Sequence, residues 1–485
     1  MTRDPIARLS VNAGVSIGDM RKLHGTTGIP APAPGTESVP DILDVWRAAH
    51  VTLVRSYDWV SRLDTVDNPT SLFPDWSADP SDPANYNFAG TDAWVSQVRS
   101  LGADIMFTIA SEIPANKQPV RDLAKYEQVV ENIVRHYVCG WGNGFENAIT
   151  HWEFGDQPDF GSLHFSGTPE QFYHMYAAAA RAVKCVDLGL QFGGPCIAFP
   201  LNEGPFREGL LTFIKDQSLP LDFLSWMWYG DNSRDPLDFR TIAAEVRTVA
   251  DQHGFGGTRL MLSYWSMTGI PTAKFEDADN AAFIAAAAVY MQDSAVDQAI
   301  FFRADTGADF HYKFRDPAGI FEPDGSENAR TSAFRLVGRT LAATERLAVS
   351  GGDEKGFAAL AGQTADSDTV RILIANYAIP DSYLNARDRD VFEFQVPIGA
   401  ERVNMSLNVP PRRVDAGSVG YTGYTLEVSD LPWGQGRYKV VRYRADAQHR
   451  GDMLGSYEGE GTSVTIESSL PAPGVELIEI TRIPS

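Results

Sequence analysis

Short apolar runs alternate with longer segments of helical periodicity from the N-terminus to about residue 345. This alternation is typical of repeated βα units that build a parallel sheet. The runs predict eight strands, at Arg8–Asn12, Val51–Arg55, Asp104–Ile109, Ile149–Phe154, Leu190–Gly193, Asp222–Trp226, Leu260–Ser263 and Gln298–Phe302. Because eight parallel strands close naturally into a barrel, we expect a (β/α)8 TIM barrel over residues 1–345.

Helical signals lie between these runs. Tyr126–Tyr137 carries apolar positions at helical spacing. Residues 168–171 supply an N-cap threonine, a first-turn proline and a capping-box glutamine ahead of a helix over Phe172–Val183. Ala281–Met291 is rich in alanine and apolar on nearly all sides, so we expect this helix to be buried against the barrel.

The pattern changes after Leu347. Short alternating runs, separated by turn residues, occur at Thr369–Asn376, Val391–Val396, Tyr424–Val428, Tyr438–Tyr443, Ser463–Glu467 and Val475–Ile480. Such spacing is typical of an antiparallel β-sandwich, which we expect over residues 346–485. Nothing in this region indicates chemistry, so we expect it to brace the barrel or to extend a binding surface.

The strand predicted at Ile149–Phe154 ends abruptly in Gly-Asp-Gln-Pro-Asp, residues 155–159. In a TIM barrel this C-terminal end of a strand is where active sites are built. The run resembles the fourth-strand motif of glycoside hydrolase family 39, the β-xylosidase and α-L-iduronidase family, which reads roughly Trp-Glu-x-Trp-Asn-Glu-Pro-Asp. In that family the second Glu is the general acid/base, and the resemblance places Gln157 at its position.

The resemblance covers most of the chain. Residues 55–58, 79–92, 135–145 and 221–226 are similar to further family tracts, and together they imply a TIM-barrel glycoside hydrolase. On the seventh strand the family has Leu-x-Glu-Trp, whose Glu is the nucleophile, and the resemblance places Tyr264 there. Histidines of the family on the sixth and second strands correspond to Met227 and Tyr57.

These substitutions remove the usual chemistry. Retaining hydrolysis needs one carboxyl that donates a proton and a second, about 5 Å away, that bonds to the sugar. The amide of Gln157 can hydrogen-bond a glycosidic oxygen but cannot give up a proton at useful pH. A tyrosine such as Tyr264 titrates near pH 10 unless perturbed, which makes it a poor nucleophile as it stands. A deliberate Glu→Gln inactivation would explain Gln157 but not Asp156, Met227 and Tyr264 together.

The first hypothesis is a glycosidase with an altered catalytic centre. Tyrosine serves as a nucleophile where a neighbouring carboxylate takes its proton, and a carboxyl of raised pKa can act as general acid. Five acids follow predicted strands and could face the same mouth: Asp58, Glu112, Asp156, Asp231 and Asp305. Each of them taken singly is more typical of a loop carboxylate that caps a backbone N–H. Glu153 should sit lower in the barrel in a structural role.

The second hypothesis is a catalytically silent, carbohydrate-binding pseudo-glycosidase. Aromatic faces stack on sugar rings, and candidates at the ends of the sixth and seventh strands are Trp226, Trp228, Tyr229, Tyr264 and Trp265. Strands alternate their faces, so about half of these should instead pack against helices. By their match to the family tracts, we expect Trp226 and Trp265 on the ligand side, with Tyr57, Asp231 and Asp305 as further binding residues.

The composition limits the classes of partner that the protein is expected to bind. The chain has 41 basic and 63 acidic residues, a net charge of −22, which repels phosphate backbones and anionic lipids. We therefore expect an oligosaccharide or glycoside as the partner, no nucleic acid and no membrane, with oligomerisation left open. A third hypothesis, a scaffold unrelated to carbohydrate that uses the sandwich as an interface, also stays open.

Three cysteines, Cys139, Cys185 and Cys196, form a sparse and odd-numbered set without metal-ligand spacing. We expect buried thiols in a reducing compartment, with no metal and no other cofactor. The N-terminal segment has no apolar signal core and no run approaches about 18 apolar residues, so a cytoplasmic location is expected.

Overall fold

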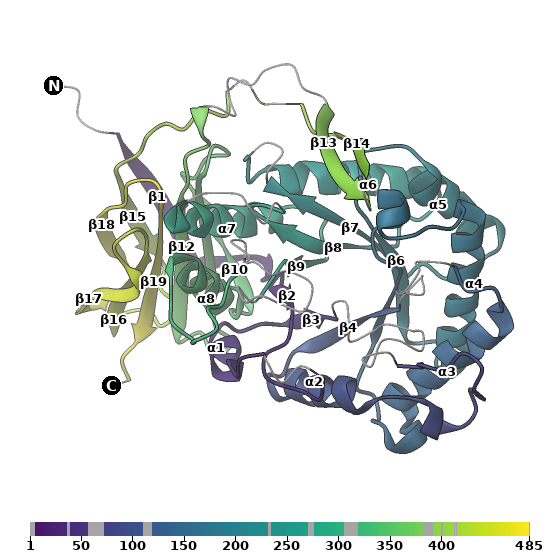
Figure 1. The fold of residues 1–485 in the computed structure, drawn as a ribbon. Helices are drawn as coiled ribbons and strands as arrows, with labels where there is room; N and C mark the ends of the chain where they lie inside the picture. The colour runs from purple at the N-terminus through teal and green to yellow at the C-terminus, as the bar shows by residue number, and fades with distance from the viewer. Residues whose placement is uncertain are drawn as a thin grey trace.

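The computed structural model describes residues 5–35, 39–56, 72–109, 119–230, 234–269, 276–304, 319–381, 391–398, 401–411, 413 and 415–484. Eight parallel strands form a closed barrel, in which each strand pairs with its neighbour in sequence and β9 pairs back to β2. They are β2 (Gly25–Thr27), β3 (Leu53–Arg55), β4 (Asp104–Ile109), β5 (His151–Phe154), β6 (Gln191–Ile197), β7 (Phe223–Tyr229), β8 (Arg259–Ser266) and β9 (Gln298–Phe301). The predicted TIM barrel is confirmed (Figure 1).

The predicted first barrel strand, Arg8–Asn12, is wrong. These residues belong to β1 (Ile6–Asp19), which pairs antiparallel with β10 (Glu345–Ser350) and parallel with β15 (Gly423–Ser429). The barrel instead begins at β2, three residues without an apolar run. The other seven predicted strands overlap β3 to β9.

Helices follow the barrel strands and surround them. They are α1 (Leu43–Ala48), α2 (Ala89–Ser100), α3 (Leu123–Cys139), α4 (Pro169–Val186), α5 (Leu210–Asp216), α6 (Asp238–Gln252), α7 (Asp277–Met291) and α8 (Ala329–Leu341). The predicted capping box of α4 is confirmed, because the Gln171 N–H donates to Thr168 Oγ1 at 3.3 Å and the Thr168 N–H donates to Gln171 Oε1 at 2.8 Å. Within the described part of the chain, no helix is long and apolar enough to cross a membrane.

The alanine-rich helix α7 is buried on nearly every face, as its sequence predicts. It contacts α8 and three strands of the C-terminal sheet: β11 (Phe357–Gln363), β12 (Thr369–Asn376) and β19 (Gly474–Arg482). In Figure 1, α7 and α8 lie between the barrel and this sheet. An all-round apolar surface is therefore required, since one side meets barrel strands and the other meets the sheet.

The expected antiparallel strands of the C-terminal region are confirmed, with one parallel pair, β1 and β15, while a β-sandwich stays a prediction. Its nine strands run in the order β17-β16-β19-β12-β11-β10-β1-β15-β18, the remaining members being β16 (Gly436–Ala445), β17 (Arg450–Gly461) and β18 (Val464–Ser469). Arg442 on β16 hydrogen-bonds Ser468 on β18, so the two ends of this sheet approach one another around a separate apolar cluster. A domain boundary at residue 345 stays a prediction, because β1 joins the sheet from the other end of the chain.

Two further strands, β13 (Val391–Ile398) and β14 (Glu401–Asn408), pair only with each other among the described residues. This hairpin lies in sequence between β12 and β15, yet Figure 1 shows it beside the barrel, near β7 and α6.

Candidate active site

Side chains that point into the barrel form two layers of opposite character. The lower layer is apolar and consists of Leu53, Met106, Phe223, Met261 and Ile300. Two residues further along the same strands, the interior becomes polar, with Arg55, Thr108, Ser225 and Ser263 around Glu153 of β5. Because all these strands are parallel, the polar layer lies toward their C-terminal ends, where TIM-barrel sites form.

Glu153 is the centre of this layer. Its Oε1 accepts hydrogen bonds from Ser225 Oγ at 2.6 Å and Ser263 Oγ at 2.7 Å. Its Oε2 accepts from Arg55 Nε at 2.6 Å and from Thr108 Oγ1 at 3.2 Å. The side chain is fully buried, and a carboxylate with this many partners is satisfied in place. Glu153 lies low in the barrel and hydrogen-bonded to its neighbours, as predicted, and its structural role stays a prediction.

Arg55 connects the buried layer to the mouth. The same guanidinium that binds Glu153 donates from Nη2 to Asp156 Oδ1 at 3.0 Å. Its central carbon lies 4.2 Å from the ring centroid of Tyr264, which is cation–π geometry. The Arg55 side chain is 1% exposed and that of Asp156 is 30% exposed. A single buried cation thus holds both Asp156 and Tyr264, two of the predicted catalytic residues.

An irregularity in β8 explains how Tyr264 reaches the interior. Trp226 of β7 pairs with Leu262, but the next residue, Met227, pairs with Tyr264, so Ser263 is an extra residue in β8. Such a bulge re-aims side chains at barrel rims. Ser263 contacts Glu153 and Tyr264 contacts Arg55, so two consecutive residues both face inward.

The loop after β5 carries Asp156, Gln157 and Asp159. It is hydrogen-bonded to the C-terminal end of β6 and to the residues just beyond it. The Gln157 N–H donates to the Cys196 carbonyl at 3.1 Å, and the Asp159 carboxylate accepts from the N–H groups of Ala198 and Phe199 at 2.8 and 2.7 Å. Burial raises the pKa of Asp159 to about 6. Gln157 adopts a left-handed backbone with φ of 52°. Its side chain is partly exposed and hydrogen-bonds no other group of the described chain, which leaves the amide available to a ligand.

Cys196 lies directly under this loop and is buried, and burial raises the pKa of its thiol well above the ordinary value. Its N–H donates to Ser225 Oγ at 2.8 Å, which connects the loop to the polar layer. The expectation of buried thiols is wrong for Cys139 and Cys185, which are exposed because they lie at the C-terminal ends of α3 and α4.

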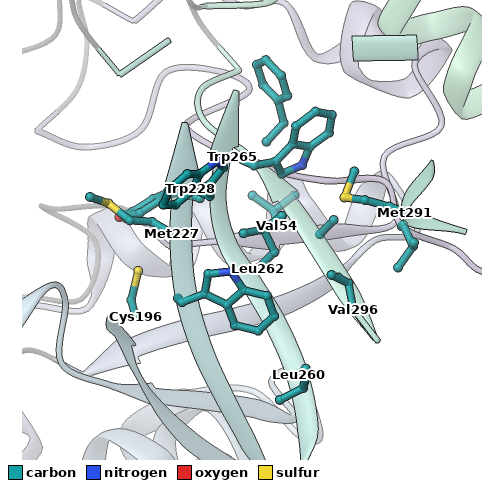
Figure 2. Packing of buried hydrophobic residues seen from close by; sticks show 14 of the residues in the cluster. Val54, Cys196, Met227, Trp228, Leu260, Leu262, Trp265, Met291 and Val296 are labelled. Carbon is teal, nitrogen blue, oxygen red and sulfur yellow. The ribbon is translucent and has the colours of Figure 1, made fainter. Parts of the chain in front are cut away.

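The predicted aromatic platform is mostly packed away from the interior. Trp226, Trp228 and Trp265 are 1%, 2% and 2% exposed. Trp265 packs edge-on against Phe239 of α6 at 5.2 Å. Figure 2 shows Met227 and Cys196 on one side of the β7 and β8 strands and Met291 and Val296 on the other. Since Ser225 faces inward, strand alternation turns Trp226 toward the helices, a placement that argues against stacking on a sugar.

Tyr229, at the end of β7, is partly buried and meets Phe302 edge-on at 6.0 Å. The other predicted site residues lie outside the described residues: Tyr57, Asp58, Glu112, Asp231 and Asp305. The described residues contain no group of three or more potential metal ligands.

Sequence reasoning gave no role to four residues that build the site: Arg55, Ser225, Ser263 and Asp159. Arg55 lies in a tract that resembles the family, and Asp159 ends the fourth-strand motif. Ser225 and Ser263 are small polar residues within strand sequences that are largely apolar, and this contrast is the signal that the sequence offers.

The TIM barrel together with a match to a sequence model of glycosyl hydrolases makes this a glycoside hydrolase-like protein. The sequence model of Glycosyl hydrolases family 39 matches residues 101–251. The chain belongs to this family.

Two β-xylosidases are among its relatives. That of Caldicellulosiruptor saccharolyticus is 28% identical over 116 residues, covering 24% of this chain and 22% of the relative. That of Geobacillus stearothermophilus is 26% identical over 187 residues, covering 35% and 36%. The chain therefore matches only about a quarter to a third of the length of these curated relatives.

Solved structures match along the whole chain. A glucosidase from Croceicoccus marinus is 78% identical, covers 100% of both chains and superposes with a TM-score of 0.97. A monomeric β-xylosidase from Caulobacter crescentus is 15% identical, covers 99% of this chain and 100% of its own, and has a TM-score of 0.72. The second likeness shows the fold alone.

Proposed function

We propose that this protein is a glycosidase with a non-standard catalytic centre, in which Tyr264 and Asp156 act in place of the usual glutamate pair. The observation that carries the proposal is the Arg55 guanidinium, which binds Asp156 at 3.0 Å and lies 4.2 Å from the ring centre of Tyr264. A fixed positive charge beside a phenol stabilises negative charge on it, as a nucleophile requires. The glucosidase of Croceicoccus marinus, similar over its full length, makes a glucoside the first substrate to test.

The proposed reaction has two steps. The Tyr264 oxygen attacks the anomeric carbon, the glycosidic C–O bond breaks, and the phenolic proton passes to Asp156. The leaving oxygen takes a proton from an acid of the mouth, for which Glu112 and Asp58 are the candidates. Water then attacks the anomeric carbon and gives its proton to that acid, while Asp156 returns the first proton to the departing phenolate.

Gln157 has a different part in this proposal. Its amide N–H group donates to the glycosidic oxygen and orients it, without transferring a proton. Glu153 takes no part in bond breaking, because four neighbouring groups occupy its oxygens and no face of it is exposed.

One observation favours a second candidate, a silent sugar-binding barrel. The Tyr264 side chain is 1% exposed, and Phe302 lies edge-on at 5.0 Å from it. A nucleophile must touch the anomeric carbon, whereas a binding protein needs no such access.

The test is an assay on aryl glucosides and xylosides of both anomeric configurations, with products detected by mass spectrometry. Tyr264→Phe, which removes one oxygen atom, and Asp156→Asn should each lower kcat by about 10²- to 10⁴-fold. Matched controls are Tyr126→Phe on the buried face of α3 and Asp251→Asn in a surface ion pair with Arg247, both expected to keep full turnover. Turnover by Tyr264→Phe within threefold of the unaltered protein would refute the assigned roles. Saturable sugar binding without product from any glycoside would favour the silent barrel.

A further inference from the structure

The β13–β14 hairpin is separated from the sheet to which its flanking strands belong. β12 and β15 lie in the nine-stranded sheet, but the described hairpin strands pair only with each other. In β14 and just beyond it, alternate side chains point in opposite directions. Met405, Leu407 and Val409 pack into the main core that the barrel and its helices share, while Asn404, Ser406 and Asn408 are exposed. The hairpin is therefore docked on the barrel by one apolar face.

Hydrogen bonds fix where it docks. Asn202 Nδ2 donates to the Ser406 carbonyl at 3.0 Å, and the Asn408 N–H donates to Asn202 Oδ1 at 2.8 Å. Asn408 Nδ2 also donates to the Leu201 carbonyl at 3.2 Å. Asn202 thus uses both ends of its amide on the backbone of β14, which fixes the position of the hairpin along the loop as well as its distance from it.

A second attachment lies further along the chain. Arg413 donates from Nε and Nη2 to the two carboxylate oxygens of Asp235 at 2.9 and 3.0 Å. Arg413 Nη2 also donates to the Glu354 carbonyl at 2.5 Å. Asp235 lies three residues before the start of α6, so the segment that follows β14 is held on the barrel as well.

The loop that receives the hairpin also holds the candidate catalytic loop. Asn202 follows β6, which ends at Ile197, so it lies at the C-terminal rim of the barrel. Just beyond β6, the N–H groups of Ala198 and Phe199 bind the Asp159 carboxylate. Within β6, the carbonyl of Cys196 binds the N–H of Gln157. The hairpin is therefore linked to the loop of Asp156 and Gln157 through one short stretch of backbone.

We propose that the β13–β14 hairpin is a specificity element of the sugar site, and that Asn202 and Asn408 are positioning residues that hold it there. The inference rests on the proposed function. Gln157 stands where the resemblance puts the group that protonates the leaving oxygen, and the hairpin is linked to the loop of Gln157 through residues 196–202. The hairpin is therefore assigned to the leaving-group side of the sugar site. It selects substrates whose leaving group is itself a sugar, and it adds little to the recognition of a small aryl leaving group.

The experiment compares two substrates with the same glycone, a disaccharide and an aryl glycoside. Asn408→Ala and Asn202→Ala should raise KM for the disaccharide about five- to tenfold, while kcat/KM for the aryl glycoside stays within about twofold. Asn202→Asp keeps the acceptor for the Asn408 N–H and loses the donor to Ser406, so its effect should be intermediate. The matched control is Asn85→Ala, a half-buried asparagine that donates to the Asp79 carbonyl at 2.8 Å away from the hairpin.

Equal changes for both substrates, or no change for either, would overturn the inference. If the unaltered protein hydrolyses no glycoside, the proposed function fails, and the hairpin is then tested by calorimetric binding of the disaccharide. Asn408→Ala should weaken that binding about fivefold and Asn85→Ala should not. Unchanged binding would overturn the specificity role by itself, and a protein that neither binds nor cleaves would overturn both proposals.

Discussion

Replacing Glu153 by glutamine tests the polar layer of the barrel. The substitution keeps the shape of the side chain but removes its charge, and it leaves Arg55 with Asp156 as its described carboxylate partner. The Glu153 and Arg55 side chains are 0% and 1% exposed, so neither water nor salt replaces the lost interaction. Removing one partner of a buried ion pair typically costs about 3–5 kcal/mol. We expect Glu153→Gln to lower the free energy of unfolding by about that amount.

Urea denaturation followed by tryptophan fluorescence measures this loss, since the barrel contains several buried tryptophans. The matched control is Glu131→Gln, which breaks an exposed ion pair with Arg135, four residues further along α3. Exposed pairs of this kind contribute at most about 1 kcal/mol. A loss of less than about 1 kcal/mol for Glu153→Gln, or equal losses for the two variants, would refute the reasoning that burial makes this network strong.

Three further outcomes are expected. Burial raises the pKa of Asp159 to about 6, so the folded protein holds this proton more tightly than the unfolded chain does. The free energy of unfolding of the protein should therefore fall by up to about 3 kcal/mol as the pH rises from about 4 to 6. Urea denaturation at a series of pH values measures this fall, which Asp159→Asn should lack. Thr168→Ala removes the N-cap of α4 and should cost about 0.5–2 kcal/mol in the same assay, whereas a null effect would contradict the observed capping box. A thiol reagent should label Cys139 and Cys185 in the folded protein and Cys196 only after unfolding, and fast labelling of all three would contradict the burial of Cys196.

Most of the barrel could be predicted because its strands are buried on both faces and appear as continuous apolar runs. The prediction of the first strand is wrong because the same search for apolar runs selected a strand of the other sheet. Arg8–Asn12 alternates exposed and buried positions, which is typical of a sheet with one solvated face, and that is where it lies. The true first strand, Gly25–Thr27, is too short for any periodicity to show. The antiparallel sheet was predictable from its alternating runs, but its recruitment of β1 depends on contacts hundreds of residues apart.

The candidate site was predictable in its location and less so in its members. Asp156, which the fourth-strand motif singles out, binds Arg55 of the polar layer, and its catalytic role stays a prediction. The side chain of Tyr264 faces inward because of the bulge at Ser263. The local sequence does not predict this bulge, because a bulge inserts one residue into an otherwise regular strand. The prediction for Trp226 and Trp265 rests on similarity of motif, whereas alternation from the inward-facing Ser225 turns Trp226 toward the helices.

The pairing of β1 has a consequence for biosynthesis. This strand is synthesised long before its two neighbours, because β10 begins at residue 345 and β15 at residue 423. Both edges of β1 lack a partner until β10 has been made, and one edge stays unpaired until β15 follows. Unpaired strand edges favour association with other nascent chains. Conditions that slow translation should accordingly increase aggregation, and a circular permutant that begins in the barrel and places β1 after β19 should relieve it.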